Sequence, residues 1–385
     1  MTESNEPVAG APSRPPRRTA YLLRIVFAAA LVFTLIGLVE ALFVGYDLAT
    51  GAFAYVRSPD LGLGVRSWTI HHAMRPGYEQ PTTHTNSFGL RSPEVAVPKP
   101  AGTYRILLLG DSFTFGFQAP DDEVFARRLE VKLRSVPEWS NTEVVNAGVL
   151  SYCPLLEFLQ YRHQLHVLEA DLVILNFDMS DVQDHLEYSR DLVRGADGRP
   201  LYVTEPSLKQ NAGIFPELLS YRWLRQKINA AKRRYEARRD NIPFVRDVDR
   251  YIWALDGGPD MVDEARQTME PIADLQRLLI HHDIPLVLAT YPQPWQVSAQ
   301  ATPAGPIRDQ YAIGQNTVHL NDRAFQKLGQ FAADHGMAFV NATGAFRGAE
   351  DPAGLFLRTD FHFSARGNDL YAETLARYLI ERGRK

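Results

Sequence analysis

From Tyr104 to the end of the chain, short runs of leucine and β-branched residues alternate with segments of helical periodicity. Successive parallel strands need a crossover connection, usually a helix, so this alternation predicts a parallel sheet with helices on both faces. The expected strands are 105–109, 143–146, 171–177, 284–290 and 337–341. The expected helices are 124–135, 155–168, 272–282, 321–335 and 365–381. The sequence thus predicts a doubly wound α/β domain with a five-stranded parallel sheet over residues 104–385.

A long insertion separates the third and fourth expected strands. It covers about residues 182–270, far more than a usual crossover, and predicts a helical insertion that shapes the cleft. Its basic residues gather in one segment: Arg222, Arg225, Lys227, Lys232, Arg233, Arg234, Arg238 and Arg239. Two interpretations stay open for this segment, a solvated helix face and a patch that binds anionic lipid headgroups or acidic glycan.

The N-terminal region contains one apolar stretch, residues 25–46, in which only Thr34 and Glu40 are polar. About 20 apolar residues are enough to cross the hydrocarbon core of a bilayer. A signal peptide has a shorter apolar run, of about 7 to 15 residues, and then a small-x-small cleavage site. Such a site cannot be placed after Val44. The sequence therefore predicts a retained transmembrane helix over residues 21–46.

The charges that flank this stretch predict its orientation. The flank that follows, residues 46–53, carries only Asp47. The positively charged residues before the stretch are Arg14, Arg17, Arg18 and Arg24. The positive-inside rule then leaves residues 1–20 as a cytoplasmic tail and exports the rest of the chain. Residues 47–103, with scattered glycine and proline, are expected to form an irregular juxtamembrane lead-in that packs against the main domain.

Composition and motifs exclude several classes of function. The formal net charge of the 385 residues is -4, and the catalytic part contains no arginine-rich arm, so nucleic acid is not an expected partner. The single cysteine, Cys153, excludes an intramolecular disulfide and every multi-cysteine metal site, and it is expected to be buried. There is no GxxxxGK[ST] phosphate loop and no HExxH zinc helix. We therefore expect no cofactor and no metal.

Residues capable of nucleophilic catalysis stand next to the expected strands. Gly110-Asp111-Ser112 directly follows the first strand, and Asp360-Phe361-His362 lies in the loop after the last one. A serine hydroxyl attacks a carbonyl usefully only if an imidazole takes its proton and an anion orients that imidazole. Ligands of doubly wound sheets bind at the carboxyl ends of the strands, where these loops meet. The sequence predicts Ser112 as nucleophile, His362 as base and Asp360 as the orienting acid.

Several segments resemble conserved blocks of the SGNH (GDSL) hydrolases. RILLLGDSFTFG resembles the first block, with Ser112 in the nucleophile position, and VVNAG resembles the second, whose glycine is Gly148. TDFHFSARGNDLYAETLARYL is similar to the last block, with Asp360 and His362 in the acid and base positions. THTNSFGLRSPE looks like the lead-in of membrane-anchored bacterial members. The resemblance implies an SGNH/flavodoxin-like strand order and a serine esterase that works through an acyl-enzyme.

The resemblance also implies an oxyanion hole with one altered member. The third block of the family ends in Asn-Asp, whereas this chain reads LNFDMSD and places Ser180 where the asparagine belongs. Asp181 is retained, and Asn176 lies inside the strand, so it replaces the missing amide only if the register shifts. The implied donors to the oxyanion are the N–H groups of Ser112 and Gly148 and the Ser180 hydroxyl.

The resemblance implies that the substrate is an acylated carbohydrate or small ester, and most specifically O-acetyl groups on a cell-envelope polysaccharide. The expected location is the bacterial inner membrane, with the catalytic domain on the periplasmic side of a single-pass anchor. Two alternatives stay open. In one, the domain is the O-acyltransferase component of polysaccharide modification and receives its acyl group from a membrane partner. In the other, the site is catalytically idle and the domain is a glycan- or lipid-binding scaffold.

Overall fold

The computed structural model describes residues 17–50, 63–205, 262–301, 317–358 and 360–384, together with residues 218, 220, 221, 223, 224 and 228. It divides into two compact units. One comprises Met1–Ser58 and Ala212–Ala231, and the other Pro59–Asn211 and Lys232–Lys385. The expected sheet, the candidate catalytic residues and the described part of the lead-in from residue 63 onward belong to the second unit, which we call the α/β unit.

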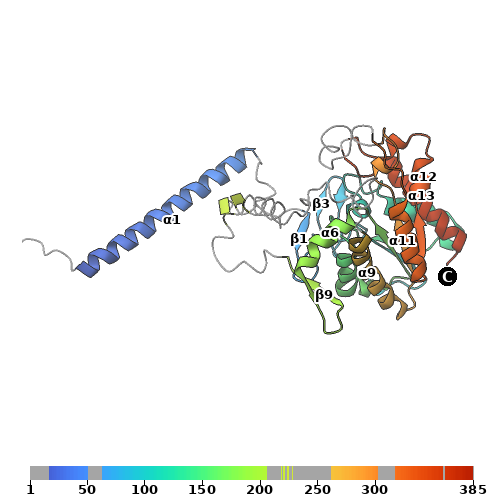
Figure 1. The fold of residues 1–385 in the computed structure, drawn as a ribbon, viewed down its shortest axis with the longest axis horizontal. Helices are drawn as coiled ribbons and strands as arrows, with labels where there is room; N and C mark the ends of the chain where they lie inside the picture. The colour runs from blue at the N-terminus through green and yellow to red at the C-terminus, as the bar shows by residue number, and fades with distance from the viewer. Residues whose placement is uncertain are drawn as a thin grey trace, which may run out of the picture. The chain divides into compact units, whose positions relative to one another are not determined.

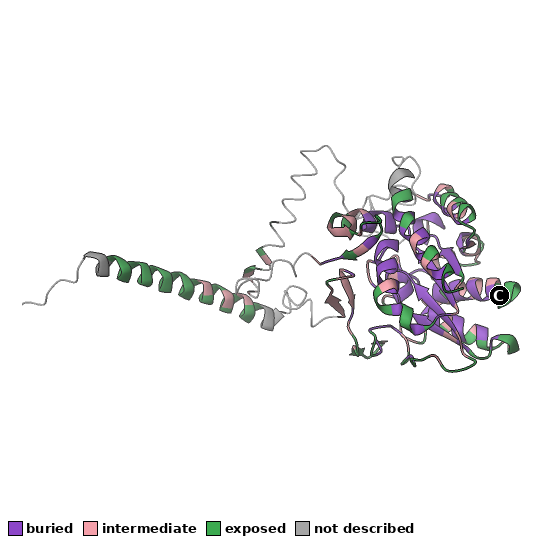
Figure 2. Ribbon diagram, turned by 90° about the horizontal axis from the view of Figure 1, so that it is seen from below, coloured by how far each residue is buried: buried purple, intermediate pink, exposed green. Residues whose placement is uncertain are grey.

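The first unit contains one long helix, α1 (Arg17–Thr50). Its segment Tyr21–Tyr46 is long and apolar enough to cross a membrane, and most of its residues are coloured as exposed in Figure 2. Glu40 accepts hydrogen bonds from the backbone N–H and the hydroxyl of Ser220, at 3.0 and 2.6 Å. A described part of the insertion therefore contacts α1 within this unit, whereas the basic residues from Arg222 to Arg239 lie outside the described residues.

The α/β unit is built on a five-stranded sheet in which every neighbouring pair is parallel. The strands are β5 (Tyr104–Leu109), β6 (Thr142–Asn146), β7 (Leu172–Phe177), β10 (Leu286–Thr290) and β11 (Ala338–Asn341). Their spatial order is β11-β10-β7-β5-β6. Counted along the chain this is the 2-1-3-4-5 order of flavodoxin-like sheets. The predicted fold class, with its five-stranded parallel sheet, is confirmed.

Helices cover both faces of this sheet (Figure 1). Successive side chains of a strand point to opposite faces, so Leu107 and Leu109 enter one core while Ile106 and Leu108 enter the other. The first core is closed by α5 (Pro154–Gln160), α9 (Val262–Ile280) and α11 (Arg323–Asp334). The second is closed by α4 (Phe125–Arg134), α12 (Thr343–Arg347) and α13 (Ala365–Arg382). Figure 2 shows the buried residues concentrated in the sheet and the inner faces of these helices.

Two helices show how local pattern produces these layers. In α4, Phe125, Leu129 and Leu133 recur every four residues, and all three are fully buried. The helix α13 begins at Ser364, whose hydroxyl accepts a hydrogen bond from the N–H of Gly367. Both helices lie close to the expected ranges.

Other elements differ from the expected ones. The α-helix expected over 155–168 ends at Gln160 and continues as a π turn (Tyr161–Leu165) and a 3-10 turn (His166–Leu168). The helix α9 starts ten residues earlier than expected, so its first half belongs to the range assigned to the insertion. The same range contains α6 (Asp181–Tyr188) and a hairpin of β8 (Leu192–Arg194) and β9 (Pro200–Val203).

The lead-in is more regular than the sequence predicts. It forms two short antiparallel pairs, β1 (Gly64–Arg66) with β2 (His72–Met74) and β3 (Glu79–Gln80) with β4 (Thr83–His84). It packs on the α/β unit, where the hydroxyl of the buried Tyr152 donates to the carbonyl of His72. Cys153, next to it, is also buried, as expected.

Burial keeps two adjacent histidines of the lead-in neutral. The Nδ1 atoms of His71 and His72 lie 2.9 Å apart, and Nε2 of His72 lies 2.7 Å from the carbonyl oxygen of Leu150. Because that carbonyl needs a donor, Nε2 of His72 carries the proton and its Nδ1 accepts from His71. Burial lowers the pKa of each histidine to about 4. The neighbouring His71 lowers the pKa of His72 further, since a second proton on His72 would set its Nδ1–H against that of His71.

This pair predicts acid-sensitive stability. The unfolded histidines titrate near 6.5, so between about pH 6.5 and pH 4 the unfolded state binds more protons, and the free energy of unfolding falls as the pH falls. The glutamine of His72→Gln can still donate to the Leu150 carbonyl but cannot titrate. We therefore expect this variant to reduce the slope of the free energy of unfolding against pH by about 1.4 kcal/mol per pH unit. Urea unfolding of the full chain in detergent at pH 6.5, 5.8 and 5.0 measures it. His163→Gln, at an exposed histidine that also contacts a backbone carbonyl, is the control. Equal slopes for His72→Gln and the wild type would contradict this assignment.

Candidate active site

Ser112 lies at the carboxyl end of β5, where it begins the short helix α3 (Ser112–Phe115). The preceding residue, Asp111, caps this helix by accepting a hydrogen bond from the N–H of Phe113 at 2.8 Å. Gly110 has a φ of +153°, and a Cβ there would lie 2.8 Å from Cβ of Thr114. A glycine is therefore required for the chain to turn this tightly from strand to helix.

The structure brings Ser112, His362 and Asp360 together, although 250 residues separate the first two. Nε2 of His362 lies 2.8 Å from the Ser112 hydroxyl oxygen, and its Nδ1 lies 2.7 Å from Oδ1 of Asp360. With Nδ1–H donating to the carboxylate, Nε2 is left to accept the hydroxyl proton. This is the geometry that nucleophilic attack by a serine requires.

Aromatic rings enclose the imidazole. The ring of Phe361 is stacked on it at a centroid distance of 4.5 Å, and those of Phe113 and Phe117 lie at 4.7 and 5.0 Å. His362 is only 6% exposed, whereas Ser112 is half-buried and open to a ligand. These contacts fix the plane of the imidazole, so a proton transfer at Nε2 has a fixed direction.

The carboxylate of Asp360 is held in its ionised form. Burial acts to raise its pKa, but the hydrogen bond and positive charge of His362 and the N–H groups of Phe361 and His362 outweigh burial and lower the pKa below its ordinary value. Phe361 N and His362 N lie 2.6 and 3.3 Å from Oδ1. An ionised Asp360 can stabilise the imidazolium that forms when His362 takes a proton.

Gly148 lies against the backbone of α3, the helix that begins at Ser112. A Cβ at this position would lie 2.6 Å from the carbonyl carbon of Thr114, so close approach requires glycine here. Its N–H donates to Oδ1 of Asn146 at 3.0 Å, and the Asn146 amide in turn donates to the Thr114 carbonyl at 2.7 Å. The Gly148 N–H thus lies beside the Ser112 helix but already has an acceptor.

The Ser180 hydroxyl is also engaged. It donates to Oδ2 of Asp178 at 2.5 Å, and the Ser180 N–H donates to the same oxygen at 2.7 Å. Gln293 donates its amide to the other oxygen, Oδ1. Three donors around a buried carboxyl group suit its ionised form. Asn176 does not replace the missing amide, since it donates to the Leu109 carbonyl and accepts from the Tyr371 hydroxyl in the core.

Several buried carboxyl groups surround the site. Burial, and then repulsion from neighbouring carboxylates, raises the pKa of Asp111, Glu157 and Asp181 well above the ordinary range. Burial also raises the pKa of Asp178, against the hydrogen bonds from Ser180 that favour its ionised form. Within the described ranges, no three His, Cys, Asp or Glu side chains are arranged to hold a metal ion. Burial and mutual repulsion thus favour the protonated form of these acids.

Two residues that contact the catalytic pair carry no sequence signal. Gln118 donates its amide to Oδ2 of Asp360 at 2.8 Å, and the Phe117 ring lies on His362. Both lie in the loop after α3, where the chain has no periodicity or motif. Only Gly116, with a φ of +82° at the end of α3, is marked by its residue type.

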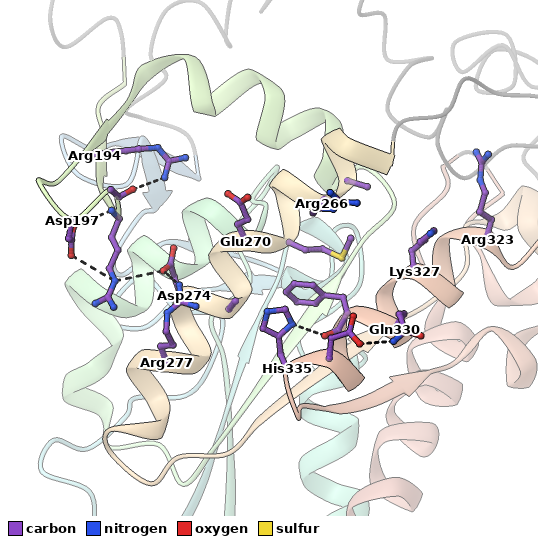
Figure 3. Close-up of a pocket in the computed structure, with 17 residues that line it drawn as sticks. Arg194, Asp197, Arg266, Glu270, Asp274, Arg277, Arg323, Lys327, Gln330 and His335 are labelled. Atoms are coloured by element: carbon purple, nitrogen blue, oxygen red, sulfur yellow. Dashed lines mark hydrogen bonds and ion pairs between the residues drawn. The ribbon is translucent and has the colours of Figure 1, made fainter.

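A groove of about 740 Å³ lies elsewhere on the α/β unit, between α9, α11 and the β8–β9 hairpin (Figure 3). It contains none of the three triad residues. Many of its charged side chains pair with one another: Asp274 contacts Arg277 and lies 4.0 Å from Arg199, which also lies 3.8 Å from Asp197. The groove is therefore separate from the chemistry at Ser112.

Comparisons with known proteins gave the following matches. A family model described as "Protein of unknown function (DUF3037)" matches residues 131–212. No curated protein matches the sequence. The lipase/acylhydrolase of Enterococcus faecalis is 12% identical, with 73% of this chain and 97% of that chain covered and a TM-score of 0.40. A catalytic mutant of the acetylxylan esterase Axe2 from Geobacillus stearothermophilus is 12% identical (71% and 93% covered, TM-score 0.37).

A GDSL-like lipase of Bacteroides thetaiotaomicron is also similar, at 12% identity, 72% and 89% coverage and a TM-score of 0.35. Independently of these matches, the strand order of the sheet is the one that the sequence blocks imply. The turn that carries Ser112, the loop that carries Gly148 and the terminal Asp-x-His loop all lie at the carboxyl edge of that sheet. The strand order, the sequence blocks and the contact between Ser112 and His362 together give this chain the fold of the SGNH hydrolases.

Proposed function

We propose that the α/β unit is a serine esterase that cleaves ester-linked acyl groups through an acyl-enzyme. The observation that carries this proposal is the 2.8 Å contact between the Ser112 hydroxyl and Nε2 of His362, with Asp360 on the opposite ring nitrogen. The half-buried Ser112 is open to a ligand, while its base is enclosed by aromatic rings. Hydrolysis of p-nitrophenyl acetate by the full chain in detergent, compared with Ser112→Ala, tests the proposal.

In this mechanism His362 takes the Ser112 proton as Oγ attacks the ester carbonyl. The carbonyl π electrons move to oxygen, which gives a tetrahedral oxyanion. When this intermediate collapses, the bond to the leaving alcohol breaks and His362 donates its proton to that alcohol. Water, deprotonated by the same imidazole, then attacks the acyl-serine and forms a second tetrahedral oxyanion. Its collapse breaks the bond to Oγ, His362 returns the proton to Oγ, and the acid is released. Asp360 holds His362 in place and stabilises the imidazolium that forms during both acylation and deacylation.

We propose the N–H groups of Ser112 and Gly148 and the Ser180 hydroxyl as the oxyanion donors. The first residue of a helix has no acceptor for its N–H within that helix, so the Ser112 N–H is well placed. The Gly148 N–H has to share its proton with Asn146, and the Ser180 hydroxyl has to turn away from Asp178. Giving up a hydrogen bond to a charged group costs about 1.5–3 kcal/mol, so the site should be slower than one with an asparagine.

This cost predicts that Ser180→Asn raises kcat. An asparagine amide has two donors, one for Asp178 and one for the oxyanion. We expect about a tenfold gain on p-nitrophenyl acetate, the equivalent of about 1.4 kcal/mol. The companion variant Ser180→Ala should lower kcat by about a hundredfold, because it removes a donor. An unchanged kcat in Ser180→Ala would remove Ser180 from the oxyanion site.

We propose acetyl groups of a cell-envelope polysaccharide as the substrate, with the α/β unit on the outer side of a bacterial inner membrane. The support is α1, whose segment Tyr21–Tyr46 can cross a membrane, and the arginines that precede it. Because a signal sequence passes the same length test, the intact N terminus has to be found in the membrane fraction. Accessibility of a cysteine introduced in the exposed loop at Asp197 to an impermeant maleimide reports the side.

The acyl-enzyme can pass its acyl group to water or to a sugar hydroxyl, so an acyltransferase with a membrane partner uses the same triad. Adding a glycan acceptor separates the two reactions. Faster release of p-nitrophenol together with an acetylated glycan indicates transfer. An unchanged rate with no acetylated product indicates hydrolysis.

A further inference from the structure

We propose that Gln118 is a positioning residue for Asp360, and that the buried Arg91 of the lead-in holds the loop that carries Gln118. This inference rests on the proposed function, because it concerns the orientation of the same catalytic acid. Gln118 touches neither Ser112 nor His362, so its effect on the reaction would pass through the Asp360 carboxylate.

The two oxygens of this carboxylate have different partners. Oδ1 faces Nδ1 of His362 at 2.7 Å and also accepts from the N–H of Phe361. Oδ2 accepts from the Gln118 amide at 2.8 Å. A carboxylate held at one oxygen only can rotate about its terminal torsion, which is broad. Holding Oδ2 therefore keeps Oδ1 aligned with the imidazole N–H.

The backbone at Gln118 is in an unusual conformation. Its φ is +62°, in the left-handed region that residues other than glycine rarely occupy. Such conformations persist only where the surroundings impose them, and they concentrate at functional sites. The surroundings are here Gly116, which ends α3 with a φ of +82°, and the contacts made by Arg91.

Arg91 holds the loop on both sides of Gln118. Its guanidinium donates to three loop carbonyls, those of Phe115 at 3.1 Å, Gly116 at 2.6 Å and Ala119 at 2.6 Å. Nε donates to Asp121 at 2.8 Å. The residue is only 4% exposed. A planar fork of donors can reach carbonyls that are spread along a loop, which a lysine ammonium cannot.

The clamped loop contacts the base as well as the acid. Phe117 lies between two carbonyls that Arg91 binds, and its ring lies 5.0 Å from that of His362. The loop therefore supports the imidazole through Phe117 and the carboxylate through Gln118. In this account the lead-in is part of the catalytic support, because Arg91 belongs to it.

Three substitutions of Gln118 test the role of the hydrogen-bond donor to Asp360. None of them is a glycine, so every variant keeps a Cβ on the same strained backbone. We expect Gln118→Ala to lower kcat on p-nitrophenyl acetate about tenfold with KM within about twofold, since in this proposal the residue acts through Asp360 rather than on the substrate. Gln118→Glu has the same shape but no donor and a like charge, so it should lose about a hundredfold. Gln118→Lys keeps a donor and should stay within about threefold of the wild type.

The matched control is Gln330→Ala. The Gln330 amide donates to the carboxylate of Asp334, and this hydrogen bond is exposed like the one from Gln118 to Asp360. Removing this hydrogen bond should leave kcat unchanged. Arg91→Lys should lower kcat of the wild type. It should lower kcat of the Gln118→Ala variant by a smaller factor, because Arg91 and Gln118 both act through the Asp360 carboxylate. If Arg91→Lys fails to fold, the series at position 118 still decides.

The order Lys above Ala above Glu in kcat supports the inference, because a purely structural role would not follow the donor capacity of the side chain. Equal kcat for the wild type and Gln118→Ala, in an enzyme whose activity depends on Ser112, would overturn this inference alone. A wild type without Ser112-dependent hydrolysis would overturn the proposed function, and this inference with it.

Discussion

Ser112→Ala is expected to lower kcat for p-nitrophenyl acetate by at least about a thousandfold, because it removes the atom that forms the acyl-enzyme. The remaining oxyanion donors and His362 can still promote a slow attack by water, so a residual rate above background is expected. The side chain is half-buried at the start of α3, and an alanine there loses only the hydrogen bonds of the hydroxyl to His362 and Asp111, so the melting temperature should change little.

Two measurements complete this test. A burst of p-nitrophenol in the wild type, equal to the enzyme concentration and absent in Ser112→Ala, shows that an acyl-enzyme accumulates. Ser189→Ala is the control, since it removes a partly buried hydroxyl that donates only to a backbone carbonyl in its own helical turn. A rate for Ser112→Ala within tenfold of the wild type would instead support the glycan- or lipid-binding scaffold.

Asp360→Asn is expected to lower kcat by about 10³–10⁴. Oδ1 must accept from Nδ1–H of His362, and Oδ2 accepts from the Gln118 amide. An asparagine has one acceptor oxygen for these two donors. If the oxygen of the new asparagine faces His362, the NH2 group of the asparagine opposes the NH2 group of Gln118. If the asparagine amide turns over, its NH2 group faces Nδ1 of His362, so Nδ1 becomes an acceptor and the imidazole proton moves to Nε2. His362 can then no longer take the serine proton.

Steady-state kinetics at pH 8 with thermal unfolding of both variants measures this effect. Asp351→Asn is the matched control, because Asp351 is an exposed aspartate of the same C-terminal loop and pairs with Arg366 at 2.5 Å without contacting the triad. It should retain kcat within about twofold. Similar losses in the two variants would show that Asp360 serves the loop rather than the imidazole.

The sequence was sufficient to predict the sheet because strand formation in a doubly wound domain is largely a local property. Ile106 to Leu109 is a continuous apolar run, and Leu172 to Phe177 is apolar except for Asn176. Both are buried on both faces, as parallel strands must be. The same topology places every strand end at one edge, so Ser112 and His362 meet although 250 residues separate them. Spacing along the chain could not show that contact by itself.

Partner choice among side chains could not be predicted in this way. Ser180 was assigned to the oxyanion by alignment of LNFDMSD, but its hydroxyl donates to Asp178, two residues earlier. Nothing in the sequence marks Gln118, whose partner Asp360 lies 242 residues away. The β8–β9 hairpin had a signal that was missed, because Asp197-Gly198 is a common turn pair and Gly198 has a φ of +79°.

The central claim, that Ser112 is a nucleophile activated by His362, is tested most directly with a fluorophosphonate. Attack by Oγ on phosphorus forms a P–O bond and expels fluoride, so the product can be located by intact mass and peptide mapping. We predict one phosphonyl group per chain, on Ser112, and labelling that slows at least a hundredfold in His362→Ala. An unlabelled chain, or a label on another residue at the same rate in Ser112→Ala, would contradict the claim.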